Sequence, residues 1–218
     1  DWSSDVCSSD LQTKRSVEIM AMNFKVFDNS QLVAEYAADI IRKQFNNNPT
    51  TIAGFHLDTD QAPVLDELKK NVEKHAVDFS QINILDYDDK KSYFEALGVP
   101  AGQVYPIAYE KDAIELIADK IKTKENKGKL TLQVVSIDEQ GKLNVSIRQG
   151  LMEAREIFLV VTGANKRDVV EKLYQENGKT SFEPADLKAH RMVNVILDKE
   201  AAAGLPEDVK AYFTSRFA

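Results

Sequence analysis

The stretch "NFKVFDNSQLVAEYAADIIRKQF", residues 23–45, contains a strand and then an amphipathic helix. Its first five residues are rich in the aromatic and β-branched side chains typical of a short strand. From Leu32 to Ile41 the apolar residues recur at intervals of three and four, which is the period of a helix with one buried face. Ser30 is a suitable N-cap, because its hydroxyl can accept a hydrogen bond from a backbone N–H of the first turn. The stretch therefore predicts a βα unit.

The same alternation of strand and helix continues to the end of the chain. Further strands are expected at residues 50–57, 81–87, 130–136, 156–163 and 192–198. Helices are expected at residues 62–75, 89–97, 110–126 and 166–177, with a last helix starting at Pro206 and a loop at 98–107. Because these strands are apolar on both faces, the pattern predicts a three-layer, doubly wound, mostly parallel α/β sheet with helices on both faces.

Residues 130–147 allow two interpretations. Two runs of alternating apolar residues flank residues 139–142, which resemble a turn, so the segment can form a β-hairpin. Alternatively, its first run is a parallel strand, and the turn is a loop that faces a ligand. In open α/β sheets ligands bind beyond the carboxyl ends of the strands. The segments to examine for function are therefore residues 57–62, 86–90, 136–146 and 162–166.

The first 21 residues are interpreted as a non-native leader. Residues 1–11, "DWSSDVCSSDL", read as the translation of a sequencing-library adapter, and residues 12–19 read as untranslated leader read in frame. Translation is then expected to start at Met20 or Met22, with residues 22–218 forming a single domain. The chain's one cysteine, Cys7, lies in this leader. The domain is therefore expected to lack disulfides, cysteine nucleophiles and cysteine-ligated metals.

Composition limits the classes of partner. The chain has 218 residues, of which 43% are apolar and 29% charged, and its net charge is -7. This acidic balance argues against nucleic-acid binding, which needs a clustered basic surface. No apolar run approaches the ~20 residues of a membrane span. We expect a cytoplasmic protein that binds neither nucleic acid nor membrane.

Three strings resemble one enzyme superfamily. They are "VDFSQINILDYDDKKSYFEALGVPAGQVYPI" at 77–107, "LMEAREIFLVVTGANKRDVVEKL" at 151–173 and "LKAHRMVNVILDKEAA" at 187–202. In this order the strings are similar to the glucosamine-6-phosphate isomerase/deaminase and 6-phosphogluconolactonase superfamily. The resemblance covers residues 22–218 and implies a Rossmann-like fold and a role in amino sugar phosphate metabolism.

The resemblance identifies three catalytic positions. Asp86 matches the aspartate that acts as a general base in the deaminases, although such an aspartate can equally cap a turn. Gln140 and Lys142 stand where the superfamily has a catalytic aspartate and histidine. An amide has no useful proton affinity, and a lysine ammonium cannot accept a proton. The family reaction is therefore expected to be impaired.

The positions implied for phosphate binding are also altered. Thr59 is retained in the phosphate loop, but Asp60 replaces its glycine and Asp58 precedes it. Carboxylates this close repel a phosphate dianion by about 3 kcal/mol per pair of unit charges at 5 Å and an effective dielectric constant of ~20. Lys166 matches a lysine that contacts the phosphate, but Asp58 and Asp60 are alternative partners for its ammonium group.

The superfamily's segment after the catalytic loop is shortened by several dozen residues. Arg148, which lies there, has two interpretations: a replacement for a phosphate-binding arginine, or a surface residue, which is the commoner role. The three histidines, His56, His75 and His190, are not spaced as metal ligands, and no metal or cofactor is expected. His56 is interpreted as a partly buried core residue.

Three functions follow. The first is a homologue that has lost the family reaction and binds a sugar, a sugar phosphate or a partner protein as a homo- or hetero-oligomer. The second is an active isomerase, deaminase or lactonase with a rearranged site that uses Asp86 as its base. The third is a changed reaction on a non-phosphorylated or cationic ligand, with an acidic mouth formed by Asp58, Asp60, Asp86 and Asp88, although capping of helices and turns is the commoner role of such aspartates. The first function also predicts an exposed apolar surface where the missing segment would have packed.

Overall fold

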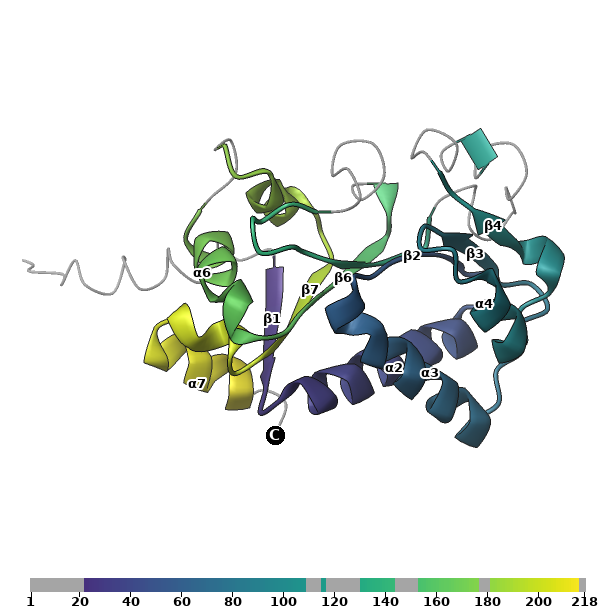
Figure 1. Ribbon diagram of the computed structural model, residues 1–218, viewed down its shortest axis with the longest axis horizontal. Helices are drawn as coiled ribbons and strands as arrows, with labels where there is room; N and C mark the ends of the chain where they lie inside the picture. The colour runs from purple at the N-terminus through teal and green to yellow at the C-terminus, as the bar shows by residue number, and fades with distance from the viewer. Residues whose placement is uncertain (1–21, 109–114, 117–129, 144–152, 177–180, 216–218) are drawn as a thin grey trace, which may run out of the picture.

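The structure, a computed structural model, describes residues 22–108, 115–116, 130–143, 153–176 and 181–215. Within these residues the strands form one seven-stranded sheet in the order β1-β7-β6-β5-β2-β3-β4, and every pairing is parallel. Figure 1 shows this sheet between its covering helices. The doubly wound α/β fold predicted from the sequence is confirmed.

The bounds follow the predicted alternation. The strands are β1 (Met22–Phe27), β2 (Ile52–His56), β3 (Asn83–Asp86), β4 (Val104–Pro106), β5 (Leu132–Ser136), β6 (Glu156–Val161) and β7 (Val193–Asp198). The α-helices are α2 (Ser30–Asn47), α3 (Ala62–Lys74), α4 (Lys91–Leu97), α6 (Arg167–Gln175) and α7 (Glu207–Ser215). Short 3-10 helices are η1 (Thr59–Gln61), η2 (Ala101–Gln103), η4 (Ala164–Lys166), η5 (Glu183–Ala189) and η6 (Ala201–Gly204). None of these described helices is long and apolar enough to cross a membrane.

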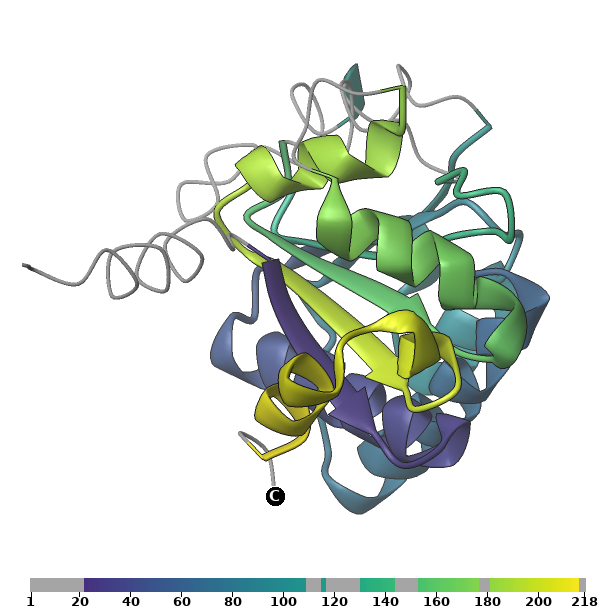
Figure 2. The same cartoon turned by 90° about the vertical axis from the view of Figure 1, so that its left-hand side faces the viewer.

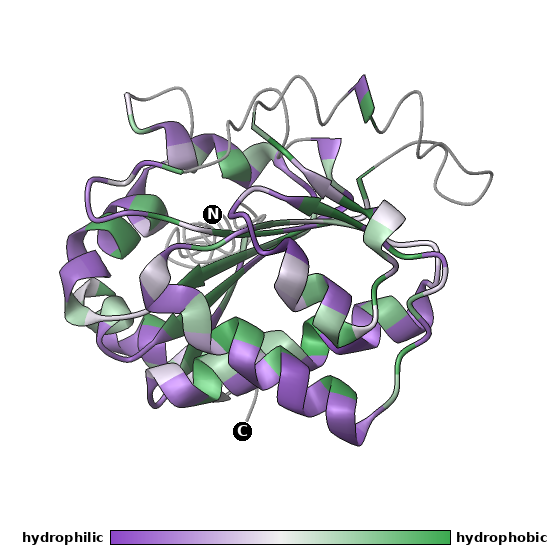
Figure 3. Ribbon diagram, turned by 45° about the vertical axis from the view of Figure 1, so that its right-hand side comes forward, coloured by the Kyte–Doolittle hydropathy of each residue, from purple (hydrophilic) through white to green (hydrophobic). Residues whose placement is uncertain are grey.

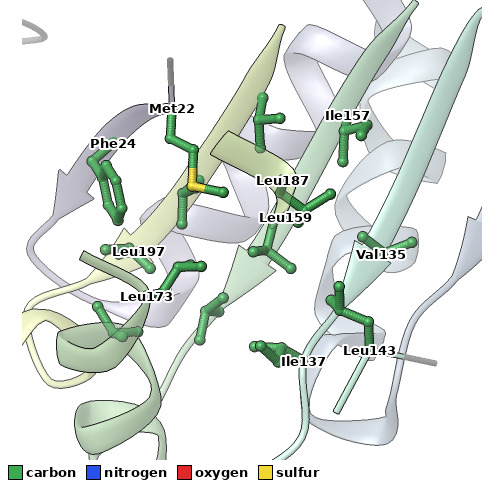
Figure 4. Close-up of a cluster of buried hydrophobic side chains, with 14 of the residues drawn as sticks. Met22, Phe24, Val135, Ile137, Leu143, Ile157, Leu159, Leu173, Leu187 and Leu197 are labelled. Carbon is green, nitrogen blue, oxygen red and sulfur yellow. The ribbon is translucent and has the colours of Figure 1, made fainter. Parts of the chain in front are cut away.

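Helices cover both faces of the sheet because successive strand residues point to opposite sides. Helices α2, α3 and α4 bury their apolar residues against one face. Helices α6 and α7, together with η5, cover the other face. Figure 2 shows the strands between these two layers, and the hydropathy colours of Figure 3 show that the strands are largely hydrophobic. Figure 4 shows part of the second layer, where Leu173 of α6 and Leu187 of η5 meet strand residues such as Leu159.

Helix α2 begins as predicted, but its N-cap is Asn29 and not Ser30. The Asn29 side chain accepts a hydrogen bond from Leu32 N at 3.0 Å. Asn29 has the extended backbone of a capping residue, with φ -156° and ψ 169°, whereas Ser30 is already the first helical residue. The predicted cap was therefore wrong by one residue.

Two further predictions are refined. The expected loop at 98–107 contains the edge strand β4, which is three residues long. Strand β5 pairs in parallel with both β2 and β6, so neither of its edges is open to the second arm of a hairpin. Among the described residues of this segment, the antiparallel pairing is one bridge between Ile137 and Leu143. Residues 144–147, and all but two residues of the helix expected at 110–126, lie outside the described residues.

The order of the strands places one switch point in the sheet. From β2 the chain proceeds to β3 and β4 on one side, whereas β5, β6 and β7 follow on the other. The carboxyl ends of β2 and β5 are therefore adjacent at the position where ligands bind in such sheets.

Glu156, at the start of β6, predicts a pH dependence of stability. Burial raises the pKa of its carboxyl group, although the hydrogen bond from Asn194 and the charge of Lys25 partly oppose the shift. A carboxyl whose pKa is higher in the native state binds protons more tightly there, so stability falls as pH rises from 4.5, the ordinary value, through the raised pKa. Glu156→Gln is expected to reduce this fall in the free energy of unfolding, measured from urea unfolding curves at several pH values, whereas the exposed Glu153→Gln should leave it unchanged. An equal dependence of the free energy of unfolding on pH in wild type and Glu156→Gln would contradict the assignment.

Candidate functional site at the carboxyl ends of the strands

Side-chain contacts join the carboxyl ends of β2 and β5. The backbone N–H of Asp58 donates to Ser136 Oγ at 2.9 Å. Lys166 Nζ donates to the backbone oxygen of Ile137 at 2.8 Å and lies 3.6 Å from Asp58 Oδ2. The Lys166 side chain is only 3% exposed. The ammonium group that the resemblance assigns to phosphate binding is therefore occupied by groups of the protein itself.

A tight turn brings Lys166 to this position. After β6 the chain turns at Gly163, whose φ of 95° lies in the region that favours glycine. The Gly163 N–H donates to the Asp198 carboxylate at 3.1 Å, which links the end of β6 to the end of β7. The one-turn helix η4 follows and closes with a hydrogen bond from Lys166 N to Gly163 O. Its last side chain then reaches back over the end of β5.

The loop after β5 is held by its own aspartate. Asp138 Oδ1 accepts hydrogen bonds from the backbone N–H groups of Gln140 at 2.9 Å and Lys142 at 2.7 Å. The Gly141 N–H donates to the Asp138 backbone oxygen, and Gly141 has a φ of 79°. The side chains of Gln140 and Lys142 are exposed. The two residues that the resemblance matches to catalytic positions are therefore exposed on a closed turn.

Asp86 is buried at the end of β3, with only 2% of its surface exposed. Its Oδ1 accepts the backbone N–H of Asp88 at 3.1 Å, which is the turn contact considered in the sequence analysis. Its Oδ2 is buried and has no hydrogen-bond partner in the described part of the chain. The carboxylate thus has one structural contact and one unused acceptor.

His56 and Asp88 form a pair that the sequence analysis missed. His56 Nδ1 contacts Asp88 Oδ1, and Asp88 Oδ2 accepts the backbone N–H of Leu57 at 2.8 Å. The imidazole also stacks on Tyr87, with ring centroids 5.6 Å apart. His56 ends β2 and Asp88 follows β3, and these strands are parallel neighbours. That shared edge was the available signal, because residues after adjacent parallel strands lie close together.

A pocket of about 330 Å³ lies next to this edge, between the first turns of α2 and α3 and the carboxyl ends of β6 and β7. Its polar lining residues are Ser30, Asp60, Gln61, Thr162, Asn165, Asp198 and Glu200. The Gln61 amide donates to Thr162 Oγ1 at 2.9 Å. None of the described residues lining the pocket is a lysine or an arginine. The described lining therefore contributes three carboxylates, Asp60, Asp198 and Glu200, together with neutral polar and apolar groups.

The predicted site residues do not all converge. Asp58, Ser136 and Lys166 meet at the switch point, whereas exposed Asp60 lines the separate pocket. Thr59 is exposed at the start of η1. Arg148 lies outside the described residues.

The other histidines are not part of this edge. His190 is buried, and its ring contacts Ala154 O at 2.7 Å and Met192 N at 3.1 Å, which indicates a structural role. His75 is exposed at the end of α3. No group of three or more histidine, cysteine or acidic side chains in the described residues is placed to hold a metal ion.

The expected apolar surface is also not seen in the described part of the chain. The large exposed hydrophobic side chains there come from separate elements: Leu32, Met192 and Tyr212.

The fold and the site define the chain as an open α/β protein with its candidate site at the switch point. No family profile matches the sequence. A stretch of 67 residues is 37% identical to a glucosamine-6-phosphate deaminase of Oceanobacillus iheyensis, and this match covers 30% of this chain and 27% of that protein. A glucosamine-6-phosphate deaminase of a Thermoanaerobacter species is 22% identical over 240 residues, which cover 84% of this chain and 95% of that protein. The alignment has 240 positions but covers only 84% of this chain, so it contains gaps in this chain.

Solved structures give the same fold. A monomeric glucosamine-6-phosphate deaminase superposes with a TM-score of 0.67 at 15% identity, covering 84% of this chain and all of that one. The 6-phosphogluconolactonase of Trypanosoma brucei has a TM-score of 0.59 at 12% identity, covering 84% and 98%. The chain is thus similar, at low identity, to glucosamine-6-phosphate deaminases over most of its length, and it shares its fold with a 6-phosphogluconolactonase, as its sequence resemblance predicted.

Proposed function

We propose that this protein is a homologue of the glucosamine-6-phosphate deaminases that has lost the family reaction and binds an unphosphorylated sugar. One observation carries the proposal: the Lys166 ammonium is buried against Asp58 and the Ile137 oxygen. A phosphate would have to displace Asp58 and also approach its negative charge. In this proposal the Asp58 carboxylate is the partner of Lys166 in place of the substrate phosphate that the resemblance implies.

The chemistry of the loop after β5 supports the same proposal. Gln140 and Lys142 replace an aspartate and a histidine, and Asp138 closes the turn that carries them. Neither side chain can act as the missing base, and both are exposed. The proposed function therefore includes no proton transfer by Gln140 or Lys142.

Activity assays with the full chain test the loss of the reaction. Ammonia release from glucosamine 6-phosphate and hydrolysis of 6-phosphogluconolactone are expected to stay at the uncatalysed rates. Thermal-shift measurements should show no saturable stabilisation by either phosphorylated sugar. Ammonia release that saturates with substrate, and that Asp86→Asn abolishes, would refute the proposal.

A change at Asp58 tests the reason for the lost phosphate affinity. Asp58→Asn removes the carboxylate charge from Lys166, so this variant should be stabilised by glucosamine 6-phosphate where wild type is not. The comparison variant is Asp60→Asn, which removes a carboxylate from the same loop but not the one that forms the ion pair with Lys166. If neither variant gains stabilisation, Asp58 is not what excludes phosphate.

A second candidate function is an active sugar-phosphate enzyme with a rearranged site. The observation that favours it is Asp86, a buried carboxylate with an unpartnered Oδ2 among the described residues. Such an oxygen can accept a proton from a substrate carbon or hydroxyl. The activity assays above decide between the two functions, because this candidate requires turnover that depends on Asp86.

A further inference from the structure

The pocket between α2, α3, β6 and β7 is acidic in its described lining. Its charged side chains there are Asp60, Asp198 and Glu200, and none of the described lining residues is a lysine or an arginine. Asp198 is 3% exposed, whereas Asp60 and Glu200 are exposed. Lys199 lies between two of these carboxylates in the sequence, but its ammonium group contacts Asp28 at 2.5 Å. The carboxylates of the pocket therefore have no lysine or arginine beside them in the described lining.

Two helix N-termini at the same pocket oppose this negative charge, because the start of a helix favours anions. Each N-terminus is equivalent to about half of a positive unit charge, so the two together offset about one carboxylate. Pro63 reduces the effect of α3 further, since it has no backbone N–H in the first turn. The carboxylates outweigh the helices, and the described lining favours a positively charged ligand.

Gln61 provides a hydrogen-bond acceptor in the wall of the pocket. Its side chain is 2% exposed, and its Nε2 donates to Thr162 Oγ1 at 2.9 Å, which fixes the orientation of the amide. Among the described residues no group donates to Gln61 Oε1. This oxygen is also not one of the fully enclosed side-chain atoms that lack a partner, so it has accessible surface. Because Gln61 lines the pocket, that surface is open to a ligand there.

The lining fits an extended organic cation better than a metal ion. Within the described residues, no three acidic or histidine side chains are placed to hold one metal ion, although three carboxylates line the pocket. Ala34, Pro63 and Val64 contribute apolar surface that can contact a carbon chain. The volume of about 330 Å³ is that of a pocket for a small organic molecule.

We propose that this pocket binds a small aliphatic amine. Gln61 Oε1 accepts a hydrogen bond from the ammonium group, which has three N–H donors and no acceptor. The three carboxylates attract its charge, and Val64 and Pro63 contact its methylene groups. This amine site is separate from the switch point, where Lys166 pairs with Asp58. The inference goes beyond the proposed function and does not rest on it.

Calorimetric titration of the full chain with putrescine and with butane-1,4-diol tests the charge of the ligand. The two molecules have the same carbon chain, but putrescine carries two ammonium groups and the diol carries two hydroxyl groups. Putrescine is expected to bind saturably and the diol is not. Added sodium chloride should weaken the binding of putrescine, because Asp60 and Glu200 are exposed and salt screens their charges.

Two variants test whether the amine binds in this pocket. Asp60→Asn and Glu200→Gln each remove one exposed carboxylate and should each weaken putrescine binding about threefold, which is the effect of a unit charge about 6 Å away in water. The double variant should weaken it about tenfold if the two effects add. The matched control is Glu73→Gln, which removes an exposed carboxylate about 17 Å along α3 from its first residue and should leave the Kd unchanged.

Side-chain amide NMR tests the contact with Gln61. In proton–nitrogen spectra of the full chain, the Nε2 signals of Gln61 should shift as putrescine is added, with the same Kd as in calorimetry. Gln103 is the internal reference, because its Nε2 donates to Ile82 O near the opposite edge of the sheet. The signals of Gln103 should not move.

Four results would overturn the amine site. They are the absence of saturable putrescine binding, equal binding of the diol, equal binding by wild type and the double variant, and Gln61 signals that do not shift. Displacement of putrescine by stoichiometric Mg²⁺ would overturn the choice of an organic cation. A parallel titration with glucose judges the sugar binding of the proposed function, so the failure of either proposal leaves the other standing.

Discussion

Lys166→Met is expected to lower the free energy of unfolding by about 3 kcal/mol, because breaking a buried ion pair leaves an uncompensated charge. Lys166 is 3% exposed and lies 3.6 Å from Asp58 Oδ2. Its removal also leaves the Ile137 backbone oxygen without its donor at 2.8 Å. Urea unfolding at neutral pH measures the change.

The control for this variant is Lys43→Met. Lys43 pairs with Asp39 at 2.6 Å, but its side chain is 58% exposed, and such surface pairs contribute less than about 1 kcal/mol. The double variant Asp58→Asn with Lys166→Met removes both charges and should recover part of the lost stability. If Lys166→Met and Lys43→Met cost the same, the contact with Asp58 does not hold Lys166, and the argument against phosphate binding loses its basis.

Gly54→Ala is expected to destabilise the protein by about 1–3 kcal/mol through overpacking of the sheet. Gly54 of β2 is the register partner of Gln133 of β5. A Cβ atom at Gly54 would lie 2.1 Å from Gln133 Oε1. Gln133 is fully buried, so its side chain has no open space into which to move. The glycine is therefore required by a close approach between strands.

Two comparisons test this explanation. Gly102→Ala should change stability by less than about 0.5 kcal/mol, because a Cβ there would have no heavy atom within 4 Å. Gln133→Ala removes the amide that Gly54→Ala would strike, and also removes nitrogen and oxygen atoms that lack hydrogen-bond partners among the described residues. The double variant should therefore be more stable than the sum of the single effects predicts. Additive effects would show that Gln133 is not the obstacle.

Hydrophobic periodicity predicted the order of the main elements because each strand and long helix carries its own repeat. The expected strands at 50–57 and 192–198 became Ile52–His56 and Val193–Asp198. Strand β4 was not predicted, since three residues on a sheet edge are too few to show a period. The N-cap shifted from Ser30 to Asn29, because two neighbouring polar residues can both cap and only the backbone angles select one.

The hairpin interpretation of residues 130–147 shows why a local sequence pattern does not determine strand pairing. The alternation and the turn at residues 138–142 are real, as the Asp138 hydrogen bonds show. Strand β5, however, is placed between β2 and β6, and these neighbours use the hydrogen-bonding groups that a hairpin partner would need. A local pattern cannot report which strands from elsewhere in the chain have already paired with a segment.

The sequence alone predicted the class of fold, the similarity to the deaminases and lactonases, and the match of Gln140 and Lys142 to two catalytic positions of that resemblance. These properties depend on residue identity and local spacing. Only the tertiary structure decided that Asp58, and not Asp60, pairs with Lys166, and that His56 meets Asp88. Those contacts join residues 108 and 32 positions apart. Which side chains meet across such separations depends on strand order and register, and both are set by packing of the whole sheet.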